Sequence, residues 1–220
     1  MNTDASAPRR RGRPVKTREA LLETREALLR AGLEVLTEKG FSASGLDEIL
    51  KRAAVPKGSF YHYFENKDAF GQALITRYAD YFVRKLERHF SDTTRAPLAR
   101  IHDAIADLQA GMARHEFRRG CLVGNLGQEM GSLPELFRAQ LSDVFADWQQ
   151  RLARCLHAAQ TAGEIPAHTD CNEAAAFFWI GWEGAVLRAK LERRMDPLDL
   201  FVRHYFAGLN TAVDASRPDR

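Results

Sequence analysis

The stretch SGLDEILKRAAVPKGSFYHYFENK, residues 44–67, decides the fold of this 220-residue chain. Its first half has apolar residues at helical spacing, and Ser44 with Asp47 three positions later is typical of a capping box. We therefore expect a helix over residues 44–54. Pro56 ends that helix and can open another, because proline disfavours helical geometry in the residue before it and needs no partner for an amide hydrogen. Two short helices around so tight a turn are typical of a helix-turn-helix, whose second helix enters the major groove of DNA.

The second helix, predicted over residues 57–64, mixes basic, small and aromatic residues. Phe60 and Phe64 are four positions apart and should point into the core, while the other side chains should face outward. An ordinary three-helix domain also has an aromatic core, but it does not leave tyrosines and a histidine outward on so short a helix. Such side chains suit phosphate and base-edge contacts. The residues predicted here to contact DNA are Ser44, Lys57, Gly58, Ser59, Tyr61, His62, Tyr63 and Lys67.

The net charge of +3 belongs to the N-terminal part of the chain, because residues 1–70 hold 13 Lys and Arg against 10 Asp and Glu, whereas residues 71–220 hold 19 of each. Arg11-Gly12-Arg13-Pro14 resembles the core of an AT-hook, in which Arg11 and Arg13 would enter a narrow minor groove. The alternative is a solvated tail that adds phosphate contacts without selecting a sequence. Both interpretations predict that the basic arm, residues 1–18, is disordered without DNA.

Residues 20–70 resemble the DNA-binding domain of the TetR family of bacterial transcriptional repressors. The similarity rests on Glu38-Lys39-Gly40-Phe41 at the end of the first helix, on the helix predicted over residues 44–54, and on the run from Lys57 to Lys67. Pro56 departs from the family pattern, since many members carry a helix-capping serine there. The resemblance implies an all-helical homodimer that binds a palindromic double-stranded DNA operator and is released by a small-molecule effector.

The rest of the chain reads as helices, and no strand pattern competes, so the predicted fold class is all-α. The helices are expected over residues 66–90, 97–115, 120–131, 134–163, 173–194 and 197–212, with Asn66 and either Asp170 or Asn172 as N-caps. We expect a DNA-binding domain over residues 19–66, a helical ligand-binding and dimerisation domain over residues 67–214, and a frayed tail over residues 215–220. No apolar run is long enough to span a membrane. Three widely spaced cysteines suggest reduced thiols in the cytoplasm.

Two helices near the C-terminus are candidates for the dimer interface. Residues 174–187 are apolar around most of the helix, and such a helix must be buried on more than one side. The last helix has its own apolar stripe. Pairing both with their symmetry mates gives a four-helix interface, and two recognition helices could then read the two halves of a palindrome. The residues predicted at the interface are Phe178, Trp179, Gly181, Ala185, Phe201 and Tyr205.

The segment from Gly120 to Gly131 is the most unusual part of the body. Its glycines recur at helical spacing, and each interior glycine costs a helix about 1 kcal/mol relative to alanine. Close approach of a second helix or of a ligand is the usual compensation, and the sequence leaves tight packing and an effector site equally open. The residues predicted to bind an effector are Arg118, Arg119, Cys121, Asn125, Gln128, Trp148 and Trp182.

Two effector mechanisms fit this segment. In the first, a small carboxylate binds Arg118 or Arg119 against tryptophan walls. In the second, neighbouring arginines and a helix N-terminus lower the pKa of Cys121, and the thiolate reacts with electrophiles or oxidants. Residues 120–129 and 179–185 resemble the acrylate-responsive repressors of dimethylsulfoniopropionate catabolism. The surroundings of Cys121 also resemble the electrophile-sensing repressor of N-ethylmaleimide reductase. Acrylate is both a carboxylate and an electrophile, so both mechanisms remain open.

Other functional classes have little support in the sequence. Cys121 and His115 are the only pair that suggests a nucleophile and its base, and no third group is evident, so an enzyme is not expected. The glycine series lacks the lysine and serine of a phosphate-binding loop, and no ligand set suggests a metal or another cofactor. The remaining alternative is a structural DNA-binding protein without an inducer.

Overall fold

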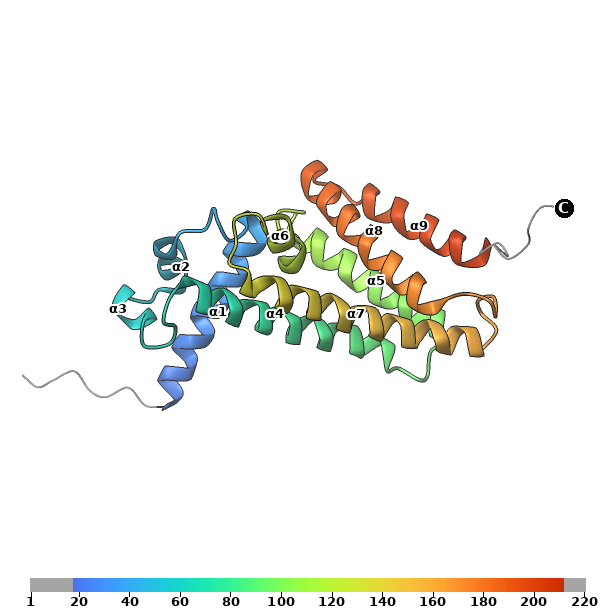
Figure 1. Ribbon diagram of the computed structural model, residues 1–220, viewed down its shortest axis with the longest axis horizontal. Coiled ribbons are helices and arrows are strands. Elements are labelled where there is room, and N and C mark those ends of the chain that lie inside the picture. The colour runs from blue at the N-terminus through green and yellow to red at the C-terminus, as the bar shows by residue number, and fades with distance from the viewer. Residues whose placement is uncertain (1–17, 212–220) are drawn as a thin grey trace, which may run out of the picture.

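The computed structural model describes residues 18–211, and within that range the chain forms helices and loops without a β-strand. The predicted residues Arg11 and Arg13, most of the predicted arm and the C-terminal tail lie outside the described residues. Figure 1 shows α1, α2 and α3 together at one end, α5, α7, α8 and α9 towards the other, and α6 between them. The helices are α1 (Arg18–Lys39), α2 (Leu46–Ala53), α3 (Lys57–Phe60), α4 (Lys67–Phe90), α5 (Pro97–Arg114), α6 (Leu122–Gln128), α7 (Leu136–Thr161), α8 (Cys171–Glu192) and α9 (Asp196–Thr211).

The first helix ends as expected at Gly40, whose φ of +84° suits glycine. The capping box predicted at Ser44 is wrong. Gly45 is the N-cap of α2 and offers no side-chain cap, while Ser44 is buried and its hydroxyl donates to the carbonyl oxygen of Gly40. Ser44 therefore ties the end of α1 to the loop before α2 and is not exposed for a DNA contact.

The recognition helix is shorter than predicted, because α3 ends at Phe60 and residues 61–63 form a turn. Phe60 and Phe64 are buried, as expected, and both lie against Phe70 of α4 with ring centroids 5.3 and 4.8 Å away. The expectation that Ser59 faces outward is wrong, since only 9% of it is exposed. Within these two turns the backbone curls around the aromatic core and leaves Tyr61 on the surface.

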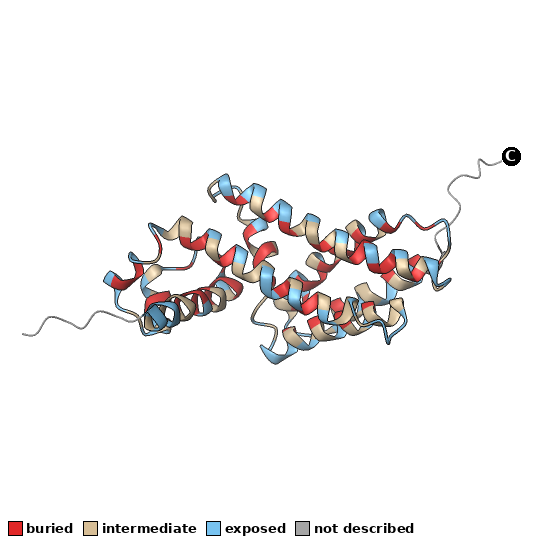
Figure 2. Cartoon of the chain, turned by 90° about the horizontal axis from the view of Figure 1, so that it is seen from below, coloured by how far each residue is buried: buried red, intermediate tan, exposed pale blue. Residues whose placement is uncertain are grey.

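One hydrophobic core runs through the molecule from α1 to α9, and Figure 2 shows buried residues along the inward faces of the helices. The predicted caps are confirmed at Asn66, whose side chain accepts from the amide of Ala69, and at Asp170, which accepts from two amides of α8. In the centre, Trp148 lies 4.2 Å from the Phe82 ring and 5.0 Å from the Trp179 ring. The helix-turn-helix end and the body therefore share one core and are packed on each other.

The helix predicted over residues 120–131 is restricted to the seven residues of α6, so its four glycines do not form one helical stripe. The thiol of Cys121 is the N-cap and accepts from the amide of Gly124 at 3.5 Å. Close approach is evident at Gly124, where a Cβ atom would clash with the carboxylate of Glu183. At Gly127 and Gly131 a Cβ atom would meet open space, so packing does not explain these two glycines.

Candidate functional site

The exposed surface of the helix-turn-helix is the candidate nucleic-acid interface. Lys57, Gly58, Tyr61 and His62 are all exposed, and 55% of Tyr61 is accessible. A Cβ atom at Gly58 would meet no neighbour, so the backbone there can be approached closely from outside. Lys57 lies 3.0 Å from Asp47, an exposed ion pair that costs little to exchange for a phosphate.

Two further predicted DNA contacts have roles inside the fold. The ammonium of Lys67 donates to the carbonyl oxygen of Phe41 at 2.8 Å and lies 4.3 Å from the centre of the Phe41 ring. Tyr63 is half-buried, and its hydroxyl oxygen is buried without a hydrogen-bond partner among the described residues. Lys67 and Tyr63 therefore support the surface of the helix-turn-helix from inside the fold and do not project from it.

A cavity of about 400 Å³ lies where α1 meets the body. Its wall combines aromatic and aliphatic side chains with several cationic groups and one carboxylate, a lining suited to an anion that has an apolar part. The lining residues come from α1, α4, α5, α8 and the segment before α6: Arg30, Leu33, Glu34, Thr37, Tyr78, Tyr81, Phe82, Lys85, Leu108, Gly111, Met112, Arg114, His115, Arg119, Gly120, Cys121, Trp182 and Val186. The DNA-binding end therefore forms part of the wall.

The structure brings three of the predicted effector residues to this cavity: Arg119, Cys121 and Trp182. The other predicted effector residues, Arg118 and Trp148 among them, do not line this cavity. Arg118 is exposed and pairs with Glu116 at 3.1 Å, outside the cavity lining. Trp148 is fully buried behind Phe82 and supports the wall without lining it.

Asn125 and Gln128 line a neighbouring hollow of about 450 Å³, and Cys121 belongs to its lining as well. The amide of Asn125 is already engaged, since it donates to the carbonyl oxygens of Leu36 and Thr37 at 3.2 and 3.1 Å. The predicted effector residues Cys121, Asn125 and Gln128 therefore have separate roles. Cys121 is the N-cap of α6, Asn125 binds the end of α1, and Gln128 is exposed.

The thiol of Cys121 lies in a buried polar cluster with Tyr78 and Glu183. Burial, followed by the Glu183 carboxylate, raises the pKa of Cys121 well above its ordinary value. Burial also raises the pKa of Glu183 to about 7, and it raises that of Tyr78. The prediction of a lowered Cys121 pKa is therefore wrong, because the group beside it is a carboxyl and the nearby Arg119 pairs with Glu34 and Glu38.

Sequence reasoning missed Tyr78, Lys85 and Glu183. Tyr78, Phe82 and Lys85 are spaced four and three residues apart, which places all of them on one face of α4. That spacing is visible in the sequence, but no local signal distinguishes Lys85 and Glu183 from ordinary solvated charges on helices. Their burial depends on how α4, α5, α6 and α8 pack, and the sequence of a single helix does not reveal it.

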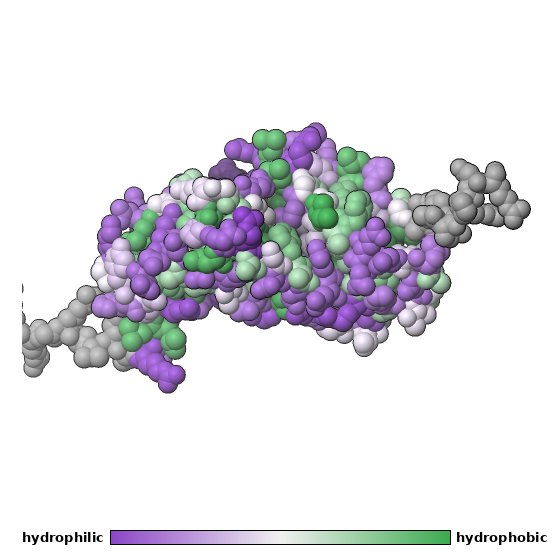
Figure 3. All heavy atoms as spheres, viewed as in Figure 1, coloured by the Kyte–Doolittle hydropathy of each residue, from purple (hydrophilic) through white to green (hydrophobic). Residues whose placement is uncertain are grey.

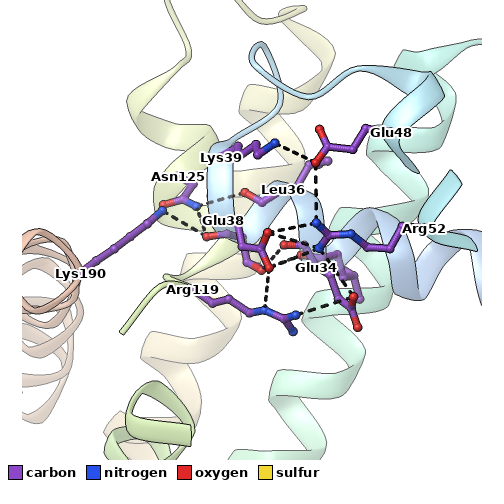
Figure 4. A network of polar contacts seen from close by, with 11 residues as sticks. Glu34, Leu36, Glu38, Lys39, Glu48, Arg52, Arg119, Asn125 and Lys190 are labelled. Carbon is purple, nitrogen blue, oxygen red and sulfur yellow. Dashed lines mark hydrogen bonds and ion pairs between the residues drawn. The ribbon is translucent and has the colours of Figure 1, made fainter. Parts of the chain in front are cut away.

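The end of α1 is held by the body, as Figure 4 shows. Besides Asn125, the amide of Gly120 and the ammonium of Lys190 donate to the carbonyl oxygen of Thr37, at 3.1 and 3.2 Å. A helix leaves its last carbonyl groups without partners inside the helix, so these donors cap α1 from outside. On its flank, Arg119 from the body and Arg52 from α2 both contact Glu34 and Glu38.

The dimer residues predicted on α8 and α9 are mostly buried within the subunit. Phe178, Trp179, Ala185 and Tyr205 are each at most 7% exposed. A Cβ atom at Gly181 would clash with the half-buried ring of Phe201, so this pair also packs inside one chain. The interface residues predicted on α8 therefore lie on its inner face, and the outer face of this helix is apolar as well.

That outer face carries Phe177, Ile180, Leu187 and Leu191, which are 59, 71, 46 and 75% exposed. With Gly184 they alternate in steps of three and four residues, the spacing of a helix that packs on a partner helix. Leu200 of α9 is exposed as well. Figure 3 shows hydrophobic residues gathered over the region where Figure 1 places α8 and α9.

Two other kinds of site are not evident in the part of the chain that the structure describes. None of its helices is long and apolar enough to cross a membrane. Between residues 18 and 211 no group of three or more His, Cys, Asp and Glu side chains is arranged to hold a metal ion.

A helix-turn-helix joined to a helical body, with a cavity that α1 helps to line, is the arrangement of a ligand-responsive transcriptional regulator. Comparison with known proteins agrees. Residues 28–74 match the bacterial regulatory proteins of the tetR family, and residues 97–205 match the tetracyclin repressor-like C-terminal domain. The chain belongs to the TetR family of transcriptional repressors.

Three relatives illustrate the similarity. The transcriptional regulator AcuR of Cereibacter sphaeroides is 56% identical over 206 residues, which are 93% of this chain and 94% of that protein. The HTH-type transcriptional repressor NemR of Escherichia coli is 32% identical over 185 residues, 83% of this chain and 92% of that one. The crystal structure of regulatory protein TetR from Rhodobacter sphaeroides has 58% identity and a TM-score of 0.82, covering 83% of this chain and 96% of that one. The named relatives are regulators of transcription and not enzymes.

Proposed function

We propose that this protein binds a palindromic operator as a homodimer and releases it when a small carboxylate, such as acrylate, occupies the cavity between α1 and the body. The location of the cavity carries the proposal, since its wall includes α1 of the DNA-binding end together with α4, α5 and α8. An effector there contacts the element that must move. The resemblance to acrylate-responsive repressors indicates the ligand, and the cationic lining suits its charge.

The proposed mechanism depends on the contacts that hold α1. Thr37 lines the cavity, and its carbonyl oxygen is also the acceptor for donors from α8 and the segment before α6. An effector that fills the space beside Thr37 shifts the end of α1 relative to those donors. The change reaches α4 as well, through Tyr78, Phe82 and Lys85, and alters the separation of the two recognition helices. Release requires that the effector bind the DNA-incompetent arrangement more tightly than the competent one.

The outer face of α8 completes the proposal. An exposed apolar stripe of this kind marks an interaction surface, and a second copy of α8 is its natural partner. A twofold axis there would set two recognition surfaces at a fixed distance, so that each reads one half of the palindrome. The contacts predicted to reach DNA are those of Lys57, Gly58, Tyr61 and His62.

The alternative is covalent sensing by Cys121. The chemical class of the ligand favours it, because an acrylate-like compound is also an electrophile. The environment opposes it, because the attacking species is the thiolate and the pKa of this buried thiol is raised. We therefore place reversible carboxylate binding first and covalent capture second.

A cavity-filling variant tests the proposed site. Met112 lines the cavity and is 9% exposed, so Met112→Trp should occupy the effector's space. The expected result is unchanged affinity for operator DNA, measured by fluorescence anisotropy with DNA flanking the gene, and at least about tenfold more acrylate or propionate required for release. Leu136→Trp, at an exposed position of α7, is the control. Normal release from a folded Met112→Trp protein would place the effector elsewhere.

A further inference from the structure

The cavity contains one deeply buried cation, the ammonium of Lys85, whose residue is only 9% exposed. Its Nζ donates to the backbone oxygen of Asp107 at 2.8 Å and lies 3.2 Å from the Asp107 carboxylate. An ammonium group has three donor hydrogens, and these contacts account for two of them. One hydrogen therefore remains for an acceptor in the cavity.

The helix opposite is shaped to accept this ammonium. A Cβ atom at Gly111 of α5 would lie 3.3 Å from Nζ of Lys85, closer than an ordinary contact. Glycine in a helix costs about 1 kcal/mol relative to alanine, and room for the ammonium is a physical reason for it here. The neighbouring wall of α5, with Leu108 and Met112, is apolar and buried.

The other cationic groups around the cavity are less suited to hold a carboxylate. Arg119 is committed to Glu34 and Glu38. His115 is exposed, and its pKa is lowered by partial desolvation of its ring and by the nearby arginines, which favours the neutral form. Arg30 and Arg114 are exposed. Because water screens exposed charges much more than buried ones, the attraction for an anion is strongest at Lys85.

When no ligand is present, the ion pair with Asp107 stabilises the buried charge of Lys85, because burying an unpaired ammonium costs several kcal/mol. The same carboxylate has a second partner, since Nε2 of His89 lies 3.2 Å from Oδ2 of Asp107. Asp107 therefore keeps a partner when the ammonium turns towards another anion. A ligand carboxylate and Asp107 are competitors for one cation.

We propose that Lys85 is the residue that binds the effector's carboxylate, and that Asp107 is its competing partner in the ligand-free protein. The inference rests on the proposed function and specifies its ligand as a monocarboxylate with an apolar remainder. The charged end contacts Lys85, and the remainder packs on Phe82, Leu108 and Met112. Arg118 and Arg119, the carboxylate partners expected from the sequence, take no part in this contact.

The test compares propionate with propionamide, its uncharged isostere, in titrations of tryptophan fluorescence, since Trp182 lies in the cavity wall. The wild-type chain should bind propionate at least about tenfold more tightly than the amide. Lys85→Met should abolish that preference, Lys85→Arg should retain part of it, and Arg118→Met should leave it unchanged. A preference that persists in folded Lys85→Met would overturn the role of Lys85 while leaving the cavity intact as the effector site.

A second variant keeps the test decisive if Lys85→Met does not fold. Asp107→Asn removes the competitor's charge and preserves the ammonium, so it should bind propionate several-fold more tightly than the wild type. Unchanged or weaker binding would overturn the competition. If the wild type binds neither compound, both this inference and the carboxylate effector of the proposed function are wrong. If it binds both equally, the cavity is an effector site but Lys85 does not select its charge.

Discussion

Oε1 of Glu129 accepts a hydrogen bond from the backbone amide of Phe41 at 2.9 Å, across 88 residues of sequence. Its Oε2 accepts from the next amide, that of Ser42, at 2.7 Å. These two amides belong to the loop between α1 and α2, whereas Glu129 is the C-cap of α6. Cys121, at the other end of α6, lines the cavity. A helix of two turns thus has the cavity at one end and the helix-turn-helix at the other.

This arrangement predicts that Glu129 couples the two sites. Hydrogen bonds to a charged group contribute about 1.5–3 kcal/mol, so Glu129→Ala should free the loop from α6. We expect propionate to bind normally by tryptophan fluorescence, while its effect on operator affinity falls at least about tenfold. Glu135→Ala, which removes an exposed carboxylate paired with Arg138, is the matched control. Full release by the effector in Glu129→Ala would show that the signal takes another route.

Tyr61 and His62 are predicted to carry operator recognition. Both are exposed, and neither is needed by the core, because Phe60 and Phe64 fill it. Tyr61→Ala or His62→Ala should lower specific operator affinity by about 1–3 kcal/mol with little change in thermal stability or in dimer mass. Anisotropy with operator and scrambled DNA separates the specific loss from a general one. Unaltered operator affinity in both variants would remove this surface from the interface.

The dimer proposal predicts a strong effect at Ile180. This side chain is 71% exposed on the outer face of α8, so a charge there should not disturb the folded subunit but should separate two apolar faces. Ile180→Glu should be monomeric by sedimentation and should lose cooperative operator binding. Leu136→Glu, at an apolar position on α7 that is 46% exposed, should remain dimeric. A dimeric Ile180→Glu protein would place the interface on another surface.

Glu183 predicts a pH dependence of stability. Burial raises its pKa from an ordinary 4.5 to about 7, so the folded protein keeps a proton that the unfolded chain has already lost. The contribution of Glu183 to the free energy of unfolding is therefore full below about pH 4.5 and is lost as the pH rises to about 7. The loss amounts to about 3 kcal/mol, at about 1.4 kcal/mol per pKa unit. Glu183→Gln should not show this loss. Denaturant unfolding of both proteins at about pH 5 and pH 8 measures the difference, and parallel curves would contradict a buried, protonated Glu183.

The long helices and the caps at Asn66 and Asp170 were predictable, because caps, prolines and helical periodicity are local signals, whereas the helices predicted over residues 57–64 and 120–131 are shorter in the structure. Ser44 shows the limit of such signals, since the same residue can cap a helix or bind a carbonyl four residues earlier. On α8 two apolar stripes lie one residue apart, so periodicity could not tell that Trp179 faces inward and Ile180 outward. Cys121 and Trp182, both predicted from the sequence, line the cavity, and their role as effector residues remains a prediction. Lys85 was not, because its burial requires that α4 and α5 be placed against each other.

In the proposed mechanism a carboxylate releases the operator by reversible binding in the cavity. The most direct measurement is operator release by acrylate and by non-electrophilic propionate, for the wild type and for Cys121→Ser, with recovery of DNA binding after dialysis. Reversible sensing predicts release by both compounds from both proteins and full recovery. Release by acrylate alone that is absent in Cys121→Ser would contradict it and establish covalent sensing, and no release in any case would remove the carboxylate effector altogether.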